Sequence, residues 1–532
     1  MKKLFYENNG SRTLFTNHKC EIGTLLTIIV SCLITAVLQG SRFFYSAHYT
    51  KVLVLACLFL FYTGLFAWLK ISKRLTENTG IYMMIFLGVL LRCGYVLLSG
   101  LYERQHDAGA YTGMGTSFVN PGHIGYIEYI YKFHKLPDIN PYELFAYYHP
   151  PLHHILSFLW LKVNILFGAS EELAFENLQI LPLLYSCLCM FTTWQTLKLL
   201  EIKRTGLLIG LAFMVFHPAS VIMAGSVNND MLTILFMCLI IYGSLKWILN
   251  KNLKHLIFLA FTIGLGMITK LNSAVLAIPL ALVFLIHFIS VIRTKKKGMI
   301  LTWVKNYCIF ALIVIPIGLS WILRNLIRFG EKPGVPVPGE TSPMYTADFS
   351  LWQRLGIPSL ADLHFDFPFH PISAKACANT WAIMFHTSLF TEEYPADLPD
   401  VLLVLCQITF ILSLLLGIAT VILLVCVLLD KRTNFQIRIF LLTGYFIMLV
   451  SFAAFVIIYP YTCSSDFRYV AITLVYISIA LGLGNRYYLQ LPPGSSGFFP
   501  AKAAPVFMHM VNCGILAVLI LIQVIYVFWG RW

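Results

Sequence analysis

Apolar runs of membrane-crossing length recur along the chain, and short polar segments separate them. A hydrocarbon core about 30 Å thick takes about 20 apolar residues per helix, so each run predicts one transmembrane helix. The pattern therefore predicts an all-α polytopic membrane protein with about 13 transmembrane helices. The runs comprise residues 22–39, 50–69, 80–100, 178–199, 206–224, 230–249, 254–269, 272–292, 301–320, 401–428, 437–459, 467–485 and 508–528.

Composition indicates the same class of protein. Of the 532 residues, 58% are hydrophobic and 12% are charged, whereas soluble domains carry roughly 25% charged residues. The net charge of +14 fits basic residues that hold topology from short cytosolic loops. There is no basic and aromatic stripe of the kind that binds single strands, so nucleic acid is not an expected partner. Arg92 stands inside the third run, where a charge is costly and implies a buried partner.

The basic residues of short loops predict the orientation. Lys2 and Lys3 place the N-terminus in the cytosol. A further apolar stretch, 151–168, is short and interrupted by histidines, and treating it as an interfacial helix keeps every later basic loop in the cytosol. Residues 122–133, rich in aromatic and polar side chains, also suit an interfacial helix. Four loops are then expected outside: two large ones, 101–177 and 321–400, and two small ones, 225–230 and 460–467.

Two acidic segments on this outer face are candidates for catalysis. His106 and Asp107 follow the third run, and Asp230 ends the tripeptide Asn228-Asn229-Asp230 that opens a helix. A carboxylate at the membrane surface can act as a general base on an acceptor hydroxyl or amine. The alternatives are a polar end to a membrane helix for Asp107 and helix capping for Asp230.

Cations on the same face are candidates for binding a phosphate. Lys270 lies in a tight turn, the pair Arg324-Asn325 follows the ninth run, and the pair Arg468-Tyr469 opens the twelfth. Separate cations that converge at one place would stabilise an anionic phosphate leaving group. For each cation alone, the alternative is snorkelling to the membrane interface.

Three histidines cluster at the start of the 151–168 stretch. His149 precedes Pro150-Pro151, which fix an extended entry, and His153 and His154 follow. The cluster suits hydrogen bonding or a divalent metal, and we expect hydrogen bonding because the prolines separate the helix positions that paired ligands need. No cofactor is assigned, and a divalent metal stays the alternative.

The sequence lacks a Walker A loop, a dinucleotide-binding glycine turn and a G-x-S-x-G elbow. The candidate segments, in their order, resemble the membrane glycosyltransferases with the C-type (GT-C) fold. The nearest branch is similar to glycosyltransferase family thirty-nine, which holds the protein O-mannosyltransferases and resembles the aminoarabinose transferases. The likeness extends over roughly residues 80–490. It rests on His106–Tyr111, His149–Leu152, Asn228–Asp230, Thr269–Asn272, Trp321–Asn325, Thr387–Phe390 and Arg468-Tyr469.

This resemblance implies transfer of a sugar from a polyprenyl-phosphate donor to a lipid, glycan or protein acceptor outside the cytosol. It implies Asp107 as the catalytic base and His149 as a residue that shapes the first loop. The chain departs from the family pattern at Ala108, where relatives often carry a second acid. The other implied site residues are Asp230 as a second acid and, toward the donor, His106, Lys270, Arg324, Asn325, Arg468 and Tyr469.

The resemblance also divides the chain. Residues 1–79 hold a cytosolic tail and two accessory helices, 80–320 a GT-C-like core, 321–400 a large outer loop, and 401–532 the C-terminal transmembrane helices. The favoured hypothesis is a polyprenyl-phosphate-sugar-dependent glycosyltransferase of a cell membrane, with a bacterial plasma membrane expected. The alternative is a multi-pass transporter or lipid flippase, a class that typically carries mid-membrane charges and internal repeats. The candidates here gather on one face and no repeat is visible, which favours the transferase.

Overall fold

The computed structural model describes residues 10–41, 48–103, 121–334, 339–358, 373–392, 398–490 and 503–530. Within these ranges, side chains are described from Glu21 onward, apart from those of His48 and Gln490. The candidate residues His106 and Asp107 lie outside the described residues.

Helices make up the fold. In the described part of the chain the one β pairing is an isolated bridge between Tyr345 and Tyr461, so the all-α prediction is confirmed. In chain order the elements are α1 (Gly10–Gln39), α3 (His48–Ile71), α4 (Glu77–Leu98), α5 (Gly122–Phe133), α6 (Leu152–Leu166), α7 (Glu171–Glu176), η2 (Asn177–Gln179), α8 (Ile180–Leu199), α9 (Arg204–Phe216), α10 (Pro218–Ile222), α11 (Asp230–Leu249), α12 (Leu253–Met267), η3 (Leu271–Leu276), α13 (Ala277–Ile292), α14 (Lys297–Phe329), α15 (Leu351–Leu355), α17 (Thr380–Phe390), α18 (Asp400–Leu429), α19 (Phe435–Ile458), η5 (Thr462–Ser465), η6 (Phe467–Val470), α20 (Thr473–Asn485), η7 (Arg486–Gln490) and α21 (Ala503–Trp529).

Among the described residues, 10 helices are long and apolar enough to cross a membrane. The number rises to 11 if the bent pair Thr462–Val470 and Thr473–Leu489 forms one span, and α9 and α12 are apolar but shorter. Each predicted apolar run falls on one of these helices, with residues 206–224 divided between α9 and the short α10. The chain is a multi-pass membrane protein, as its sequence predicts.

The centre of the bundle depends on close contact between α9 and α20. A Cβ added at Gly210 would meet the carbonyl oxygen of Ser478 at 2.6 Å, and one added at Gly206 would meet that of Gly482 at 2.8 Å. Small residues allow this approach, which is a common basis of packing between membrane helices. Every residue of α20 is buried, so this helix lies at the core of the fold.

Arg92 in α4 is fully buried. Its guanidinium donates hydrogen bonds to Ser186 Oγ at 2.8 Å, to Ser220 Oγ at 2.8 Å and to the carbonyl oxygen of Val215 at 2.9 Å. Ser186 belongs to α8, while Val215 and Ser220 lie on either side of the break between α9 and α10. These neutral oxygens are the partners that the sequence implies without naming, and they join four helices.

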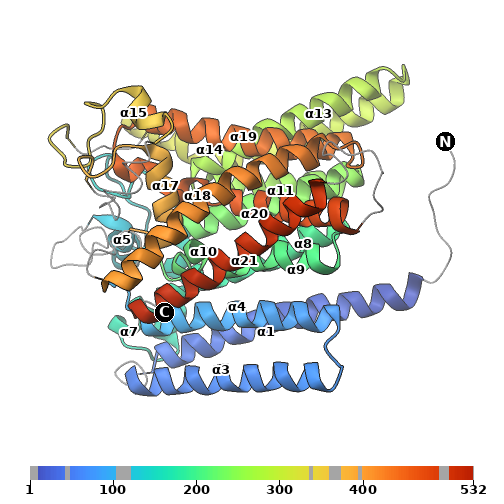
Figure 1. The fold of residues 1–532 in the computed structure, drawn as a ribbon. Coiled ribbons are helices and arrows are strands. Elements are labelled where there is room, and N and C mark those ends of the chain that lie inside the picture. Colours follow the sequence, from blue (N-terminus) through green and yellow to red (C-terminus); the bar gives the residue numbers. More distant parts are fainter. Residues whose placement is uncertain are drawn as a thin grey trace.

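The short helices α5, α7, α15 and α17 gather at one end of the bundle, which we call the loop end (Figure 1). On one side of the bundle, α1, α3 and α4 form a layer with α3 at its outer edge (Figure 1). The loop end therefore holds the segments that the sequence assigns to the two large outer loops.

The helix predicted over residues 151–168 is the separate, 15-residue α6. At 1.5 Å per residue it is about 22 Å long, which is short of a core about 30 Å thick. The other predicted interfacial helix is α5, and it is buried rather than spread on a surface. Its Ile124 and Ile127 share an apolar cluster with Leu161 of α6.

Candidate functional site

A cavity of about 770 Å³ lies at the loop end. All four segments that the sequence places in outer loops contribute to its wall. Tyr148 comes from the first large loop, Thr387 from the second, and Asp230 and Asp466 from the two small loops. Segments far apart in the sequence therefore enclose one space.

Asp230 is held at the cavity wall by the two asparagines that precede it. Asn228 Oδ1 accepts a hydrogen bond from the Asp230 backbone N–H at 3.0 Å. Asn229 donates from Nδ2 to the carbonyl oxygen of Thr269 at 2.9 Å, which ties this turn to the turn that carries Lys270. Asp230 is the first residue of α11, and the N-cap position belongs to Asn229.

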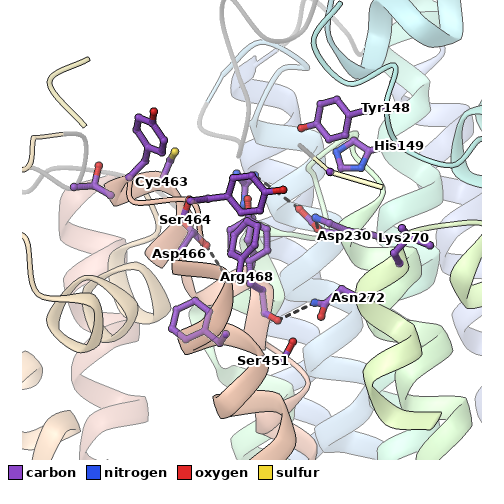
Figure 2. A pocket seen from close by; sticks show the side chains of 18 of the residues that line it. Tyr148, His149, Asp230, Lys270, Asn272, Ser451, Cys463, Ser464, Asp466 and Arg468 are labelled. Atoms are coloured by element: carbon purple, nitrogen blue, oxygen red, sulfur yellow. Dashed lines mark hydrogen bonds and ion pairs between the residues drawn. The ribbon is translucent and has the colours of Figure 1, made fainter. Parts of the chain in front are cut away.

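The carboxylate of Asp230 faces two cations. Lys270 donates a hydrogen bond from Nζ to Asp230 Oδ1, and Arg468 Nη1 lies 3.7 Å from Oδ2. All three side chains are largely buried: Asp230 is 6% exposed, Lys270 is 14% exposed and Arg468 is 9% exposed. Figure 2 shows them converging at one side of the cavity. Two of the three predicted cations therefore meet one predicted acid, and together these three side chains carry a net charge of +1.

Tyr469 and Asn272 hold the two cationic segments together. The ring of Tyr469 lies 4.9 Å from Lys270 Nζ and 5.3 Å from the Arg468 guanidinium carbon, both within the range of cation–π attraction. Asn272 donates from Nδ2 to the carbonyl oxygen of Tyr469 at 3.0 Å (Figure 2). The start of η3 and the η6 turn are thereby fixed to each other beside the cavity.

The turn that carries Arg468 is also tied to the second large loop. Asp466 Oδ1 accepts a hydrogen bond from the Arg468 backbone N–H at 2.7 Å. Thr387 of α17 accepts one from the Phe467 backbone N–H at 2.9 Å. Thr387 belongs to one of the segments that carry the family resemblance, and its place in the structure supports the cationic turn.

His149 lines the cavity beside this group. Its ring stacks on His123 with centroids 5.2 Å apart, and His123 Nδ1 lies 3.1 Å from His154 Nε2. Burial lowers the pKa of His149 well below its usual range, and the positive charge of Lys270 acts in the same direction. His149 is therefore a neutral imidazole at pH 7, held in a stack of rings.

Arg324 and Asn325 are not among the described residues that line the cavity. Arg324 donates hydrogen bonds to the carbonyl oxygen of Pro137 and to Asn325 Oδ1, and its guanidinium carbon lies 4.4 Å from the Trp321 ring centre. Trp321 in turn donates from its indole N–H to the carbonyl oxygen of Tyr148 at 3.3 Å. The end of α14 thus supports the first large loop, next to the cavity wall.

The segment that leads to Asp107 begins close to the segment that leads to Asp230. Gln179 donates from its amide nitrogen Nε2 to the carbonyl oxygens of Ser99 and Gly225, at 3.3 and 3.2 Å. Ser99 follows α4 directly, and Gly225 begins the turn before Asp230. The described chain therefore leaves α4 at the loop end, on the side of the bundle that carries Asp230.

The wall of the cavity also has an apolar part. It is built by Leu271 and Val275 of η3 and by Met448, Phe452 and Phe455 of α19. These side chains adjoin the charged group, because η3 follows Lys270 directly and α19 leads into the turn that carries Arg468. The cavity therefore suits a ligand that has an anionic group next to a hydrocarbon segment.

Sequence reasoning missed several residues of this wall. Asp466, His123, Tyr148 and Asn272 line the cavity without having been candidates for the site. Asp466 had a signal, because it is an acid two residues before a candidate cation in a loop predicted outside. His123 had none, since only the packing of α5 on α6 brings it to His149. Among the described residues, no group of three His, Cys, Asp or Glu side chains is arranged to hold a metal ion.

Comparison with known proteins finds a family match in the middle of the chain. Residues 149–321 match the model of a family described as dolichyl-phosphate-mannose-protein mannosyltransferase. The resemblance to these transferases is therefore confirmed over a segment that holds His149, Asp230 and Lys270. A search of the curated proteins gives no match.

Two of the solved structures that the chain matches are the following. One is the oligosaccharyltransferase AglB of Archaeoglobus fulgidus with an inhibitory peptide and a dolichol-phosphate, at 12% identity and a TM-score of 0.42 over 83% of this chain and 55% of that chain. This chain thus spans about half of the archaeal protein's length. The other is ArnT of Cupriavidus metallidurans bound to undecaprenyl phosphate, at 13% identity and a TM-score of 0.36 over 82% of this chain and 85% of that chain.

Proposed function

We propose that this protein is a glycosyltransferase that takes a sugar from a polyprenyl-phosphate-linked donor and transfers it to an acceptor on the extracytoplasmic face of a cell membrane. The observation that carries the proposal is the meeting of Lys270, Arg468 and Asp230 at the wall of one cavity. The match of residues 149–321 to a family of dolichyl-phosphate-mannose transferases supports the same donor chemistry.

The charged group suits the phosphate of such a donor. Lys270 and Arg468 supply several N–H donors in a largely buried site, where charge-assisted hydrogen bonds to phosphate are strong. As the bond between the sugar and phosphate breaks, its electron pair stays on the phosphate oxygen, and nearby cations stabilise that charge. Arg324 donates to the carbonyl oxygen of Pro137 and is proposed to contribute indirectly, by supporting the first loop behind the wall.

The apolar wall suits the prenyl chain. A lipid donor needs its phosphate at a polar site and its hydrocarbon in contact with apolar side chains or membrane lipid. Phe452, Phe455 and Met448 provide such a surface on α19, a helix apolar enough to span a membrane. The donor would therefore enter with its headgroup in the cavity and its chain along this wall.

Proton transfer is assigned to Asp107. The acceptor hydroxyl or amine forms the new bond to the sugar carbon, and its proton passes to the carboxylate of Asp107 as general base. Asp107 lies outside the described residues, so this role rests on its place in the sequence after α4 and on the resemblance. Asp230 is the second acidic residue of the site.

The test is to incubate the purified full-length protein with labelled undecaprenyl-phosphate sugars and a membrane extract as acceptor source. We expect one donor to lose its sugar to an acceptor, and we expect Asp107→Asn to abolish that transfer while leaving the protein folded. The same donors in proteoliposomes form the second arm. Movement of intact donor across the bilayer, without any new glycosidic bond, would establish a transporter or flippase instead.

A further inference from the structure

Asp230 occupies the place on the two cations that a phosphate ligand needs. Its Oδ1 accepts from Lys270 and its Oδ2 faces Arg468 at 3.7 Å, so one carboxylate engages both cations. The phosphate of the donor is a diester, and its two non-bridging oxygens can accept from the two cations in the same way. Carboxylate and phosphate therefore compete for Lys270 and Arg468.

We propose that Asp230 is an internal counter-ion that the donor phosphate displaces from Lys270 and Arg468. This inference rests on the proposed function and assigns a specific task to the second acid of the site. Without donor, the carboxylate neutralises part of the positive charge and keeps the two cations in place. With donor, the phosphate takes over the cations, and the carboxylate turns into the cavity to receive a hydrogen bond from the acceptor.

The backbone around Asp230 allows this exchange with a small motion. The hydrogen bond from the Asp230 N–H to Asn228 and the bond from Asn229 to Thr269 both fix the main chain. Neither bond uses the Asp230 carboxylate, so the main chain can keep its position while the side chain rotates away from Lys270. The turn between α12 and η3 and the start of α11 keep their positions, and the cations stay where the phosphate needs them.

The exchange has a consequence for the order of binding. While the carboxylate is engaged by Lys270 and Arg468, its oxygens are directed at these cations rather than at an acceptor hydroxyl. Donor phosphate must therefore arrive before the acceptor gains this hydrogen-bond partner. Removing the carboxylate should improve binding of the phosphate and impair transfer, a combination that a merely structural role would not give.

The test measures binding of undecaprenyl phosphate, undecaprenol and inorganic phosphate to the purified full-length protein. For Asp230→Asn we expect undecaprenyl phosphate to bind about tenfold more tightly than to wild type, with slower sugar transfer. Undecaprenol should bind both proteins equally, since it has no phosphate. Inorganic phosphate should show the same gain at lower affinity, which separates the headgroup from the lipid chain. Glu201→Gln is the charge-matched control, because Glu201 is exposed and pairs with Arg486 away from the cavity.

Equal or weaker binding of undecaprenyl phosphate by Asp230→Asn would overturn the inference and leave the proposed donor standing. Absence of binding to wild type would overturn the proposed donor itself. A structure of the wild-type protein with undecaprenyl phosphate gives a second test that needs no variant. We expect the phosphate on Lys270 and Arg468, with Asp230 turned away, and an intact contact between Asp230 and Lys270 would contradict the inference.

Discussion

Two sites among the described residues hold largely buried cations in opposite ways. Arg92 lies fully buried among helices and donates to serine hydroxyls and carbonyl oxygens. Lys270 and Arg468 lie at the wall of a cavity and face the carboxylate of Asp230. The first site uses neutral, fixed oxygens, and the second uses a charged side chain that can turn away.

This difference separates a structural charge from a functional one. The acceptors of Arg92 include backbone carbonyls, which cannot leave without unfolding the break between α9 and α10. The carboxylate that Lys270 and Arg468 face belongs to a side chain, and the non-bridging oxygens of a phosphate ligand can replace it. A buried cation in a membrane protein therefore indicates ligand binding when its partner is exchangeable and a cavity adjoins it.

The largest effect on stability is expected at Arg92. Arg92→Met removes the donor for Ser186, Ser220 and Val215 and leaves buried oxygens unsatisfied, which should cost about 3 kcal/mol or more. Thermal unfolding of the purified protein measures this loss. Arg486→Met is the control, since Arg486 is partly exposed and pairs with an exposed glutamate. An unchanged unfolding temperature in Arg92→Met would contradict a structural role.

The largest effect on activity is expected at the cavity cations. Lys270→Met and Arg468→Met each remove a donor to the leaving phosphate and should slow sugar transfer by about a hundredfold. Their unfolding temperatures should stay close to that of the wild type, because the removed charge is at the cavity wall. Initial rates with the identified donor provide the measurement. If either variant unfolds as readily as Arg92→Met, the two kinds of site are not distinct.

A smaller effect is expected at Arg324. This residue was a predicted phosphate ligand, yet its guanidinium contacts Pro137 and the Trp321 ring rather than lining the cavity. Arg324→Met should therefore slow transfer by less than about tenfold, acting through the first loop. Rates for this variant and for Lys270→Met are compared under the same conditions. Equal losses would show that Arg324 reaches the phosphate directly.

The smallest effect concerns His149 and pH. Its pKa is lowered in the folded protein, so the unfolded chain takes up a proton first as the pH falls below about 6.5. The unfolded state then binds more protons, so the free energy of unfolding decreases as the pH decreases. For one group this decrease is at most about 1.4 kcal/mol per pH unit. His149→Gln should flatten this part of the curve of unfolding temperature against pH. A curve identical to that of the wild type would mean that His149 does not contribute.

Much of the fold could be predicted because membrane helices have a local signal. A run such as residues 230–249 is apolar over the whole length that a bilayer requires, and α11 covers the same residues. The interfacial assignment of residues 151–168 came from the length of the stretch, its histidines and the charge of later loops, and α6 is indeed too short to span. The boundaries of short elements such as α10 could not be predicted, because Pro218 and the hydrogen bonds of Arg92 define them together.

The site could be predicted only in part. Asp230, Lys270 and Arg468 were expected on one face, and topology was sufficient for that, because each lies at the end of an apolar run. Loop charge predicts on which face of the membrane a helix ends, but not where in the plane of the membrane that end lies. For this reason Arg324 was expected at the phosphate site, although it does not line the cavity. His123 was missed for the converse reason, since its contact with His149 depends on tertiary packing.

The central claim is that Lys270 and Arg468 form the binding site for a lipid-linked phosphate. The most direct measurement is the affinity of undecaprenyl phosphate and of undecaprenol for wild type and for a variant that carries both Lys270→Met and Arg468→Met. We predict that wild type prefers the phosphorylated lipid and that the double variant binds both lipids alike. A double variant that keeps the full preference for the phosphate, with an unchanged unfolding temperature, would contradict the account.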